Sequence, residues 1–192
     1  MKLVRKVKMS VTSFEIGDQI SFKIPSYGKH TMTAHEVYDD GSALFIFDEC
    51  VTDRPMDTTG NEDIDFWSSE LCKWLNNEFL NLLPRKIRRR IINLNNPPCF
   101  PIRIPTRSEI FGKDDASENY ESDGGKQLKL MKIRKNRVCS SPLDEYAWYW
   151  LLNKRRDVVS AAYFAFVGHD GDCYSYSASG TRGVRPAFVL SV

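Results

Sequence analysis

The stretch SASGTRGVRPAFVLSV, residues 177–192, decides how this chain is expected to fold. Two glycines, Gly180 and Gly183, frame a threonine and an arginine, and an apolar segment then runs to Val192. Chain ends usually fray unless a sheet or a docked element holds them. Because this end is so apolar, we predict that it is paired as a strand inside the fold.

Length and composition favour one compact domain over residues 1–192. Hydrophobic residues make up 42% of the chain, and no apolar run approaches the length of a membrane helix. Residues 1–13 are basic but lack the apolar core and the cleavage site of a secretory signal. We therefore expect a soluble protein made in the cytoplasm, with no membrane partner; association with a virion is left open.

Charge and cysteine usage exclude several classes of protein. The chain has 27 basic and 25 acidic residues, a net charge of +2, so no global field attracts nucleic acid or membrane. The cysteines show no CxxC pattern and no close spacing to histidine, which argues against a zinc cluster and a disulfide framework. We expect reduced, mostly buried thiols, no metal and no cofactor. The cysteines are Cys50, Cys72, Cys99, Cys139 and Cys173.

The first half of the chain predicts strands followed by helices. Residues 14–49 alternate like short strands, with a turn signal at Asp40-Gly41. Apolar residues then recur at helical spacing, with Ser68 as the expected N-cap. Pro84 is placed to begin a second short helix, so a helical hairpin should cover one face of a sheet. The first helix has its apolar stripe at Leu71, Trp74, Leu75, Phe79 and Leu82, of which Trp74 is assigned a structural role.

The second half returns to strands after an irregular segment. Thr106 and Glu109 have the spacing of a capping box, and Gly112 is placed to end that very short helix. The polar run 113–126 predicts a long surface loop. Strand patterns then continue from Glu145 to the end. The layout predicts an α+β fold with mixed or antiparallel sheets and with the first and last strands in one sheet.

A basic run at residues 85–90 is the strongest local charge feature. Clustered cations can bind phosphate, so nucleic-acid contact is one interpretation. An amphipathic helix with a solvated basic face is the interpretation we prefer, because Ile87, Ile91 and Ile92 supply an apolar stripe. The residues of this possible basic patch are Arg85, Lys86, Arg88, Arg89 and Arg90.

Signatures of catalysis are absent from the sequence. None of His30, His35 and His169 stands beside a cysteine or serine in a nucleophile signature. The paired acidic residues lack the alternating oxygen ligands of a calcium loop. We therefore assign no catalytic residue, and an enzyme with an unrecognised site is kept as an alternative.

An aromatic cluster occupies the last third of the chain. In alternating strands, half of these side chains should fill the core and half should face outward. Outward tyrosines beside serines form a surface suited to binding, because rigid aromatic rings bury area at little entropic cost. Trp150 is assigned to the core. The cluster comprises Tyr146, Trp148, Tyr149, Trp150, Tyr163, Phe164, Phe166, Tyr174 and Tyr176.

Four segments in order resemble a domain family found in gut bacteria and their phages. They are SELCKWLNNEFLNLLP, IPTRSEIFG, WYWLL and GVRPAFVL, which match the family's LRxWLNxxF helix, LPSxxEIFG-like element, WWLRS-like strand and terminal GVRPAF. The resemblance runs from about Phe14 to the end. Leu152 stands where the family usually has arginine after its Trp-Leu pair, so no role of that arginine is carried over.

The ending also resembles the GFR termini of the formylglycine-generating-enzyme type of C-type-lectin-like fold, which phage tropism determinants use to display ligand-binding surfaces. The resemblance implies that Arg185 reaches into a buried polar network, that Gly183 permits an unusual backbone shape and that Pro186 interrupts strand pairing. The closely spaced cysteines that hold copper in oxidase members are missing near the C-terminus, where Cys173 stands alone.

The resulting hypothesis is a non-catalytic recognition module of a phage or mobile element that binds a protein or glycan of the host. The main alternative is an intracellular inhibitor of a host protein, such as a defence component. In the resembled fold the ligand face lies just before the terminal strand. The expected contact residues are Asn153, Arg155, Arg156, His169, Asp172, Tyr174, Tyr176 and Arg182.

Overall fold

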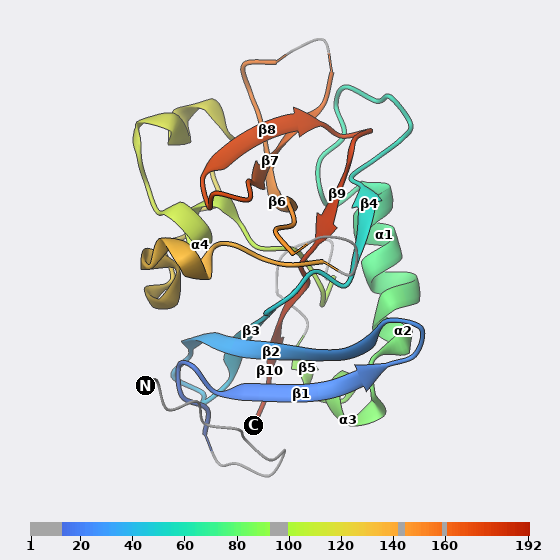
Figure 1. Cartoon of the computed structure of the whole chain (residues 1–192), viewed down its shortest axis with the longest axis vertical. Helices are drawn as coiled ribbons and strands as arrows, with labels where there is room; N and C mark the ends of the chain where they lie inside the picture. Colours follow the sequence, from blue (N-terminus) through green and yellow to red (C-terminus); the bar gives the residue numbers. More distant parts are fainter. Residues whose placement is uncertain (1–12, 93–99, 142–144, 159–160) are drawn as a thin grey trace.

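The computed structural model describes residues 13–92, 100–141, 145–158 and 161–192 (Figure 1). These residues form a single domain with two five-stranded sheets, so the expected α+β class is confirmed. The first and last strands, β1 and β10, lie in the same sheet, as predicted. None of the helices in these ranges is long and apolar enough to cross a membrane. Cys99 and most of the basic N-terminal segment lie outside the described residues.

Both sheets are built mainly from antiparallel pairs. The first has the order β1 (Gln19–Ile24), β2 (Gly28–Val37), β3 (Ala43–Phe47), β10 (Ala187–Leu190) and β5 (Ile91–Ile92). The second has the order β4 (Thr52–Pro55), β9 (Thr181–Val184), β6 (Tyr149–Lys154), β7 (Tyr163–Val167) and β8 (Cys173–Ser177). Strands β6 and β9 pair in parallel, which makes the second sheet mixed.

Two chain segments cross between the sheets side by side. The segment from β3 to β4 pairs with the segment from β9 to β10, first in one sheet and then in the other. At the crossing, the Phe47 amide donates to the Pro186 carbonyl at 3.0 Å, and the Val51 amide donates to the Val184 carbonyl at 2.9 Å. The stretch GVRPAF is therefore shared between two strands in two sheets, whereas the sequence predicted one terminal strand.

Arg185 completes the hydrogen bonding where this ladder breaks. Pro186 has no amide hydrogen to return to Phe47, so the Phe47 carbonyl lacks its usual backbone donor. The Arg185 Nε donates to that carbonyl at 2.7 Å, and its Nη1 donates to the Tyr149 hydroxyl at 3.1 Å. Arg185 is only 3% exposed, as predicted. The Arg-Pro pair thus interrupts the backbone ladder and supplies a side-chain donor in its place.

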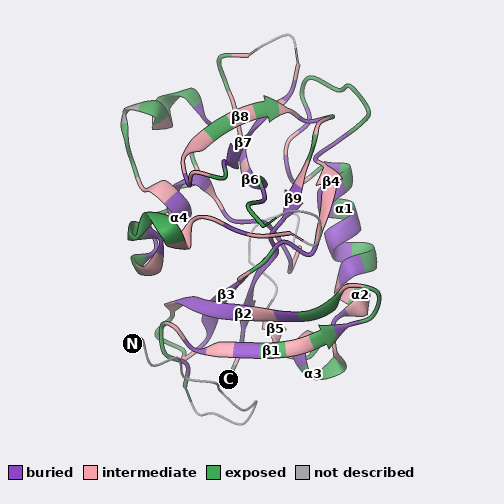
Figure 2. Ribbon diagram, in the orientation of Figure 1, coloured by how far each residue is buried: buried purple, intermediate pink, exposed green. Residues whose placement is uncertain are grey.

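Two cores lie on opposite faces of the crossing strands. The strands β3 and β10 themselves are buried (Figure 2). Phe45, Phe47 and Phe188 point to one core, which also holds Trp150. Leu44, Ile46 and Val189 point to the other, which holds Tyr149. This division follows from the alternation of side chains along a strand. Trp150 is fully buried, and its indole donates to the Arg54 carbonyl at 2.9 Å, which supports its structural assignment.

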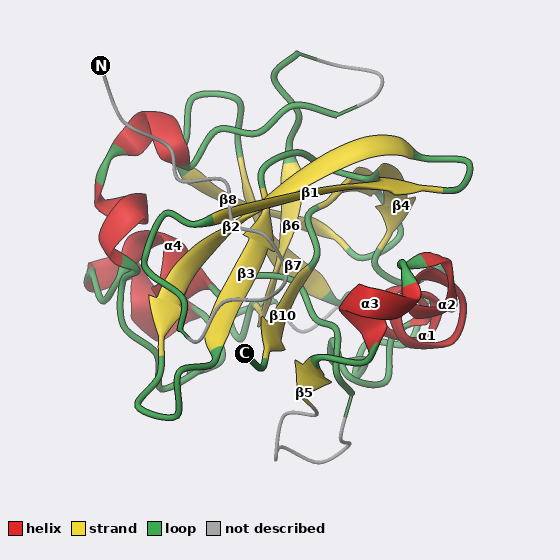
Figure 3. Cartoon of the chain, turned by 90° about the horizontal axis from the view of Figure 1, so that it is seen from below, coloured by secondary structure: helices red, strands yellow, loops and turns green. Residues whose placement is uncertain are grey.

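A helical segment covers the first core (Figure 3). It consists of α1 (Glu70–Trp74), a π-helical turn η1 (Leu75–Phe79) and α2 (Leu80–Leu82). The N-cap is Ser69 and not Ser68 as predicted, because the Ser69 hydroxyl accepts from the Cys72 amide while Ser68 bonds to Asp65. Trp74 is buried, with the Arg54 guanidinium 4.4 Å from its ring centre. The second arm of the predicted hairpin is a single turn, α3 (Arg85–Arg88).

A second helical group covers the other core. It comprises α4 (Arg107–Phe111) and the short turns η2 (Asp115–Asn119), η3 (Lys129–Lys132) and η4 (Arg134–Asn136). The capping box of Thr106 and Glu109 and the C-cap at Gly112 are confirmed. Ile110 and Met131 are the fully buried contacts of this group.

Gly183 serves a different purpose from the predicted one. Its backbone does not adopt the left-handed conformation found at several other glycines of the chain. A Cβ at this position would lie 2.6 Å from the Cys50 Sγ and 3.0 Å from the Trp148 carbonyl oxygen. Glycine is therefore required here for close approach and not for backbone shape.

Arg185→Ala should destabilise the protein by about 2–6 kcal/mol, because two buried acceptors would each lose their donor at about 1–3 kcal/mol. The substitution would leave the Phe47 carbonyl and the Tyr149 hydroxyl without their donor. Urea unfolding measures the loss, with the exposed Arg89→Ala as the control, expected to change stability by less than about 0.5 kcal/mol. Equal stabilities for the two variants would show that Arg185 does not hold the crossing.

Candidate recognition surface

Exposed aromatic side chains gather at one end of the second sheet. Trp148 precedes β6, Tyr174 and Tyr176 lie on β8, and Arg182 on β9 reaches between them. The three rings remain 43%, 46% and 46% exposed, respectively. These four residues are called the aromatic surface below. Large aromatic side chains left this open are characteristic of binding sites, because soluble proteins usually bury them.

Arg182 is held among the rings of this surface. Its guanidinium carbon lies 4.1 Å from the ring centre of Tyr176 and 4.9 Å from those of Trp148 and Phe166. Burial lowers the pKa of the arginine from its ordinary value. Such cation–π contacts favour a charged group over the ring faces. The guanidinium therefore fixes the orientation of the surrounding rings.

The rings also stack across neighbouring strands. Ring centres are 5.7 Å apart between Trp148 and Phe166, and 5.6 Å apart between Phe166 and Tyr174. The Trp148 indole donates to His169 Nδ1 at 3.0 Å. The Tyr174 hydroxyl donates to Asp170 at 2.7 Å, which raises the pKa of the tyrosine. The surface is thus ordered before any ligand arrives.

Strand β8, which carries both tyrosines, is an edge strand. It lies at the end of the second sheet, and within the described residues it forms a strand ladder only with β7. An edge strand presents backbone donors and acceptors to one side. The aromatic surface therefore adjoins a strand edge to which an extended peptide could pair.

The structure brings together four of the predicted contact residues, namely His169, Tyr174, Tyr176 and Arg182. Asp172 lies at the turn before β8, where it pairs with Arg134 at 2.6 Å. Trp148 was not among the predicted contact residues. Its spacing of two from Trp150 places it on the same face as that core residue, so the alternation predicted burial and gave no signal of its exposure.

Asn153, another predicted contact residue, does not belong to the aromatic surface. It is 3% exposed, and its amide group accepts from the Arg107 amide and donates to the Glu121 carbonyl and to Asp123. Arg155 lies on the opposite face from the tyrosines, because it donates to Ser175, which alternates with them along β8. Arg156 is exposed but lines a separate cleft beside Asn153.

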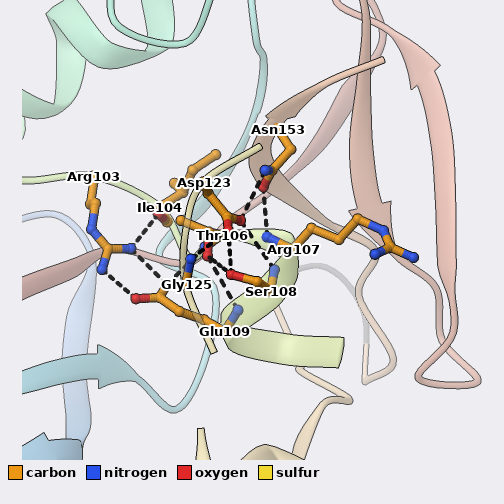
Figure 4. Close-up of polar contacts among 9 residues, drawn as sticks. All are labelled: Arg103, Ile104, Thr106, Arg107, Ser108, Glu109, Asp123, Gly125 and Asn153. Carbon is orange, nitrogen blue, oxygen red and sulfur yellow. Dashed lines mark hydrogen bonds and ion pairs between the residues drawn. The ribbon is translucent and has the colours of Figure 1, made fainter. Parts of the chain in front are cut away.

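That cleft lies between α4 and the loop 113–126 and has a volume of about 320 Å³. Its inner wall is a closed polar network (Figure 4). Asp123 accepts from the Ser108 hydroxyl and amide, from the Gly125 amide and from Asn153. These bonds lower the pKa of Asp123, although partial burial opposes the shift. The network ties the predicted surface loop to the body of the protein.

Two arginines extend the network on either side of α4. Arg103 pairs with Glu109 at 2.5 and 2.8 Å, and the same carboxylate accepts from the Thr106 amide. Arg107 binds both oxygens of Asp114, at 2.7 and 2.9 Å. Because most of the strongly polar groups here already bond one another, a structural role explains the network. In the described part of the chain, no three metal-binding side chains lie close enough together to hold a metal ion.

The basic patch lies on and just after α3, away from these features (Figure 1). Arg85, Lys86 and Arg89 are exposed, and no ion pair is formed by them within the described residues. Arg88 donates to Asn81 at 3.2 Å. Ile87 is buried as predicted, but Ile91 and Ile92, which were expected in the same helical stripe, form strand β5 and are only partly buried.

Comparison with protein families places the chain in a defined group. The model of DUF6273, a domain of unknown function, matches residues 40–192. The chain therefore belongs to the DUF6273 family. No curated protein and no solved structure matched it. The matched region includes both the aromatic surface and the crossing segments.

Asp123→Asn should destabilise the protein at neutral pH, and the difference from the wild type should shrink as the pH falls below about 4. The pKa of Asp123 is lowered in the folded state, so its contribution is complete above the ordinary carboxyl pKa. It is lost as the pH falls through the lowered value. Urea unfolding between pH 2.5 and 7 measures this, with the exposed Asp39→Asn as the control for loss of one charge. A constant difference across this range would contradict the assignment.

Proposed function

We propose that this protein is a non-catalytic recognition module that binds a protein or glycan ligand through the aromatic surface. The observation that carries the proposal is a group of exposed rings that are held in place. Arg182 packs on Trp148 and Tyr176, while Tyr174 stacks on Phe166 and bonds to Asp170. Tryptophan, tyrosine and arginine are the residue types enriched among binding hot spots.

The order of the surface supports this function energetically. Binding usually requires side chains to give up rotamer freedom, at about 0.5–1.5 kcal/mol for each flexible side chain. Here Tyr174 is held by stacking and by its bond to Asp170, while Tyr176 packs on Arg182. Because the rings already hold one orientation, ligand binding would cost less side-chain entropy, and the binding free energy would be more favourable.

The proposal extends to the origin of the protein, a phage or mobile element, and to its relationship with the C-type-lectin-like fold. A phage or mobile-element protein of C-type-lectin-like fold would display its ligand face just before the terminal strand, and β8 and β9 occupy that position here. The support for this relationship is the likeness of the terminal GVRPAF to that fold's ending. The proposal of ligand binding stands on the aromatic surface and does not require that origin.

An inhibitor of a host protein is the second candidate. The observation that favours it is the basic patch, where Arg85, Lys86 and Arg89 are exposed without ion pairs in the described structure. Such a group suits an acidic protein surface, because complementary charge accelerates association. The same cations would also suit phosphate groups.

Tyr174→Ala combined with Tyr176→Ala should weaken ligand binding at least about tenfold, since each ring is placed as a hot spot. The ligand would first be identified by capture from host lysate with mass spectrometry and by a glycan array. Affinity would then be measured by calorimetry for the wild type and for the double variant. Both tyrosines are half exposed, so the fold should survive the substitutions.

The matched control is Arg88→Ala combined with Arg89→Ala, which changes the basic patch by the same number of residues. This variant should retain wild-type affinity. If it alone loses binding while both variants remain folded by circular dichroism, the partner meets α3 and the aromatic surface is not the site.

A further inference from the structure

Two cysteines from distant parts of the chain meet inside the second core. The Sγ atoms of Cys50 and Cys139 are 3.3 Å apart, although 89 residues separate them in sequence. Both side chains are buried. The backbones are adjacent as well, because the Cys50 amide donates to the Ser140 carbonyl at 2.8 Å. A disulfide bond is about 2.05 Å long, so the sulfur atoms would need to approach by only roughly 1.3 Å.

The terminal GVRPAF segment encloses this pair. Gly183 leaves the space that the Cys50 sulfur occupies, since a Cβ there would lie 2.6 Å from it. Arg185 brings a buried positive charge, and its two side-chain hydrogen bonds go to neutral oxygens, those of Phe47 and Tyr149. A buried cation is stabilised by a nearby negative group. The Asp48 carboxylate is one group that interacts with Arg185 electrostatically, and the thiol pair can provide a second by losing one proton.

We propose that Cys50 and Cys139 form an oxidisable dithiol, a modification site in which Cys139 is the nucleophile, Cys50 is the resolving thiol and Arg185 is the positioning cation. Burial opposes ionisation of both sulfurs. The Cys50 thiol and the Arg185 charge nevertheless lower the pKa of Cys139, while burial and the neighbouring sulfur raise that of Cys50. The position of the two sulfurs supports the same division of roles, because Cys139 is 3% exposed whereas Cys50 is 0% exposed, so Cys139 is the cysteine nearer to solvent.

The oxidant is a small hydroperoxide, with hydrogen peroxide as the probe. The Cys139 thiolate attacks one peroxide oxygen, the O–O bond breaks, and the leaving hydroxide takes a proton to become water. The resulting Cys139 sulfenic acid is attacked by the Cys50 sulfur, the S–O bond breaks, and the Cys50 proton leaves with the hydroxide as a second water. In total, two thiols are oxidised to one disulfide and one peroxide is reduced to two waters.

The other described cysteines lack this arrangement. Burial raises the pKa of Cys72 to about 12, and its sulfur has the Asn76 amide as its neighbour. Burial also raises the pKa of Cys173, which lies beside Arg107 and Tyr120. Within the described residues, neither Cys72 nor Cys173 contacts a second sulfur. They therefore serve as internal controls for selective chemistry.

Treatment of the folded chain with hydrogen peroxide, followed by alkylation and peptide mapping, tests the proposal. The wild type should yield a Cys50–Cys139 linked peptide that reverts on reduction. Cys72→Ser and Cys173→Ser should retain the linkage, and Cys139→Ser should lose it. In Cys50→Ser, the sulfenic acid should persist and be trapped by dimedone at Cys139.

The wild-type map decides the question even where a serine variant fails to fold. Free Cys50 and Cys139 thiols beside an oxidised Cys173 would overturn the dithiol. Dimedone labelling of Cys50 in Cys139→Ser, without labelling of Cys139 in Cys50→Ser, would overturn the assignment of the nucleophile.

Discussion

The hydrogen bond from Arg185 to the Phe47 carbonyl is the interaction on which the two sheets depend. The paired segments β3–β4 and β9–β10 contribute strands to both sheets. The backbone hydrogen bonds between these two segments cannot continue through Pro186. A buried carbonyl without a donor would cost about 1–3 kcal/mol. The guanidinium supplies that donor and at the same time reaches Tyr149 in the second sheet. One side chain thereby closes the gap and joins both sheets.

The crossing also determines how the candidate sites are distributed. Because side chains alternate, Arg182 and Val184 share one face of β9 while Gly183 and Arg185 share the other. The first face leads to the aromatic surface, and the second leads to the thiol pair. The same alternation on β8 separates the two exposed tyrosines from Ser175, which meets Arg155. The aromatic surface and the thiol pair therefore lie on opposite sides of a few strands.

Local signals in the sequence predicted local structure well. Thr106 and Glu109 form their capping box because both partners lie within one helical turn. The apolar stripe around Trp74 placed the helix, but the choice between Ser68 and Ser69 as N-cap depended on which hydroxyl Asp65 would engage. That competition is decided by geometry, so a pattern of residue types could not resolve it.

Contacts between distant segments were the part that the sequence could not predict. Asn153 was expected at the ligand face because the resembled fold builds that face from segments before the terminal strand, yet the loop carrying Glu121 and Asp123 folds over it. The contact between Cys50 and Cys139 and the close packing of Gly183 against Cys50 likewise could not be predicted without knowing how the two crossing segments pair. Regular spacing reveals only which face a residue occupies.

The position of β9 at the crossing fixes Arg182 beside Trp148 in the aromatic surface. Gly183 donates its amide to the Trp148 carbonyl at 2.7 Å, so the strand that carries Arg182 is bonded directly to the residue that carries the exposed indole. Arg182 and Trp148 are therefore held together through both backbone and side chain. A shift of β9 by one residue would turn Arg182 toward the thiol core and open the ring cluster. Since Arg185 opposes that shift by its bond to Phe47, the buried Arg185 maintains the register on which the partly buried Arg182 depends.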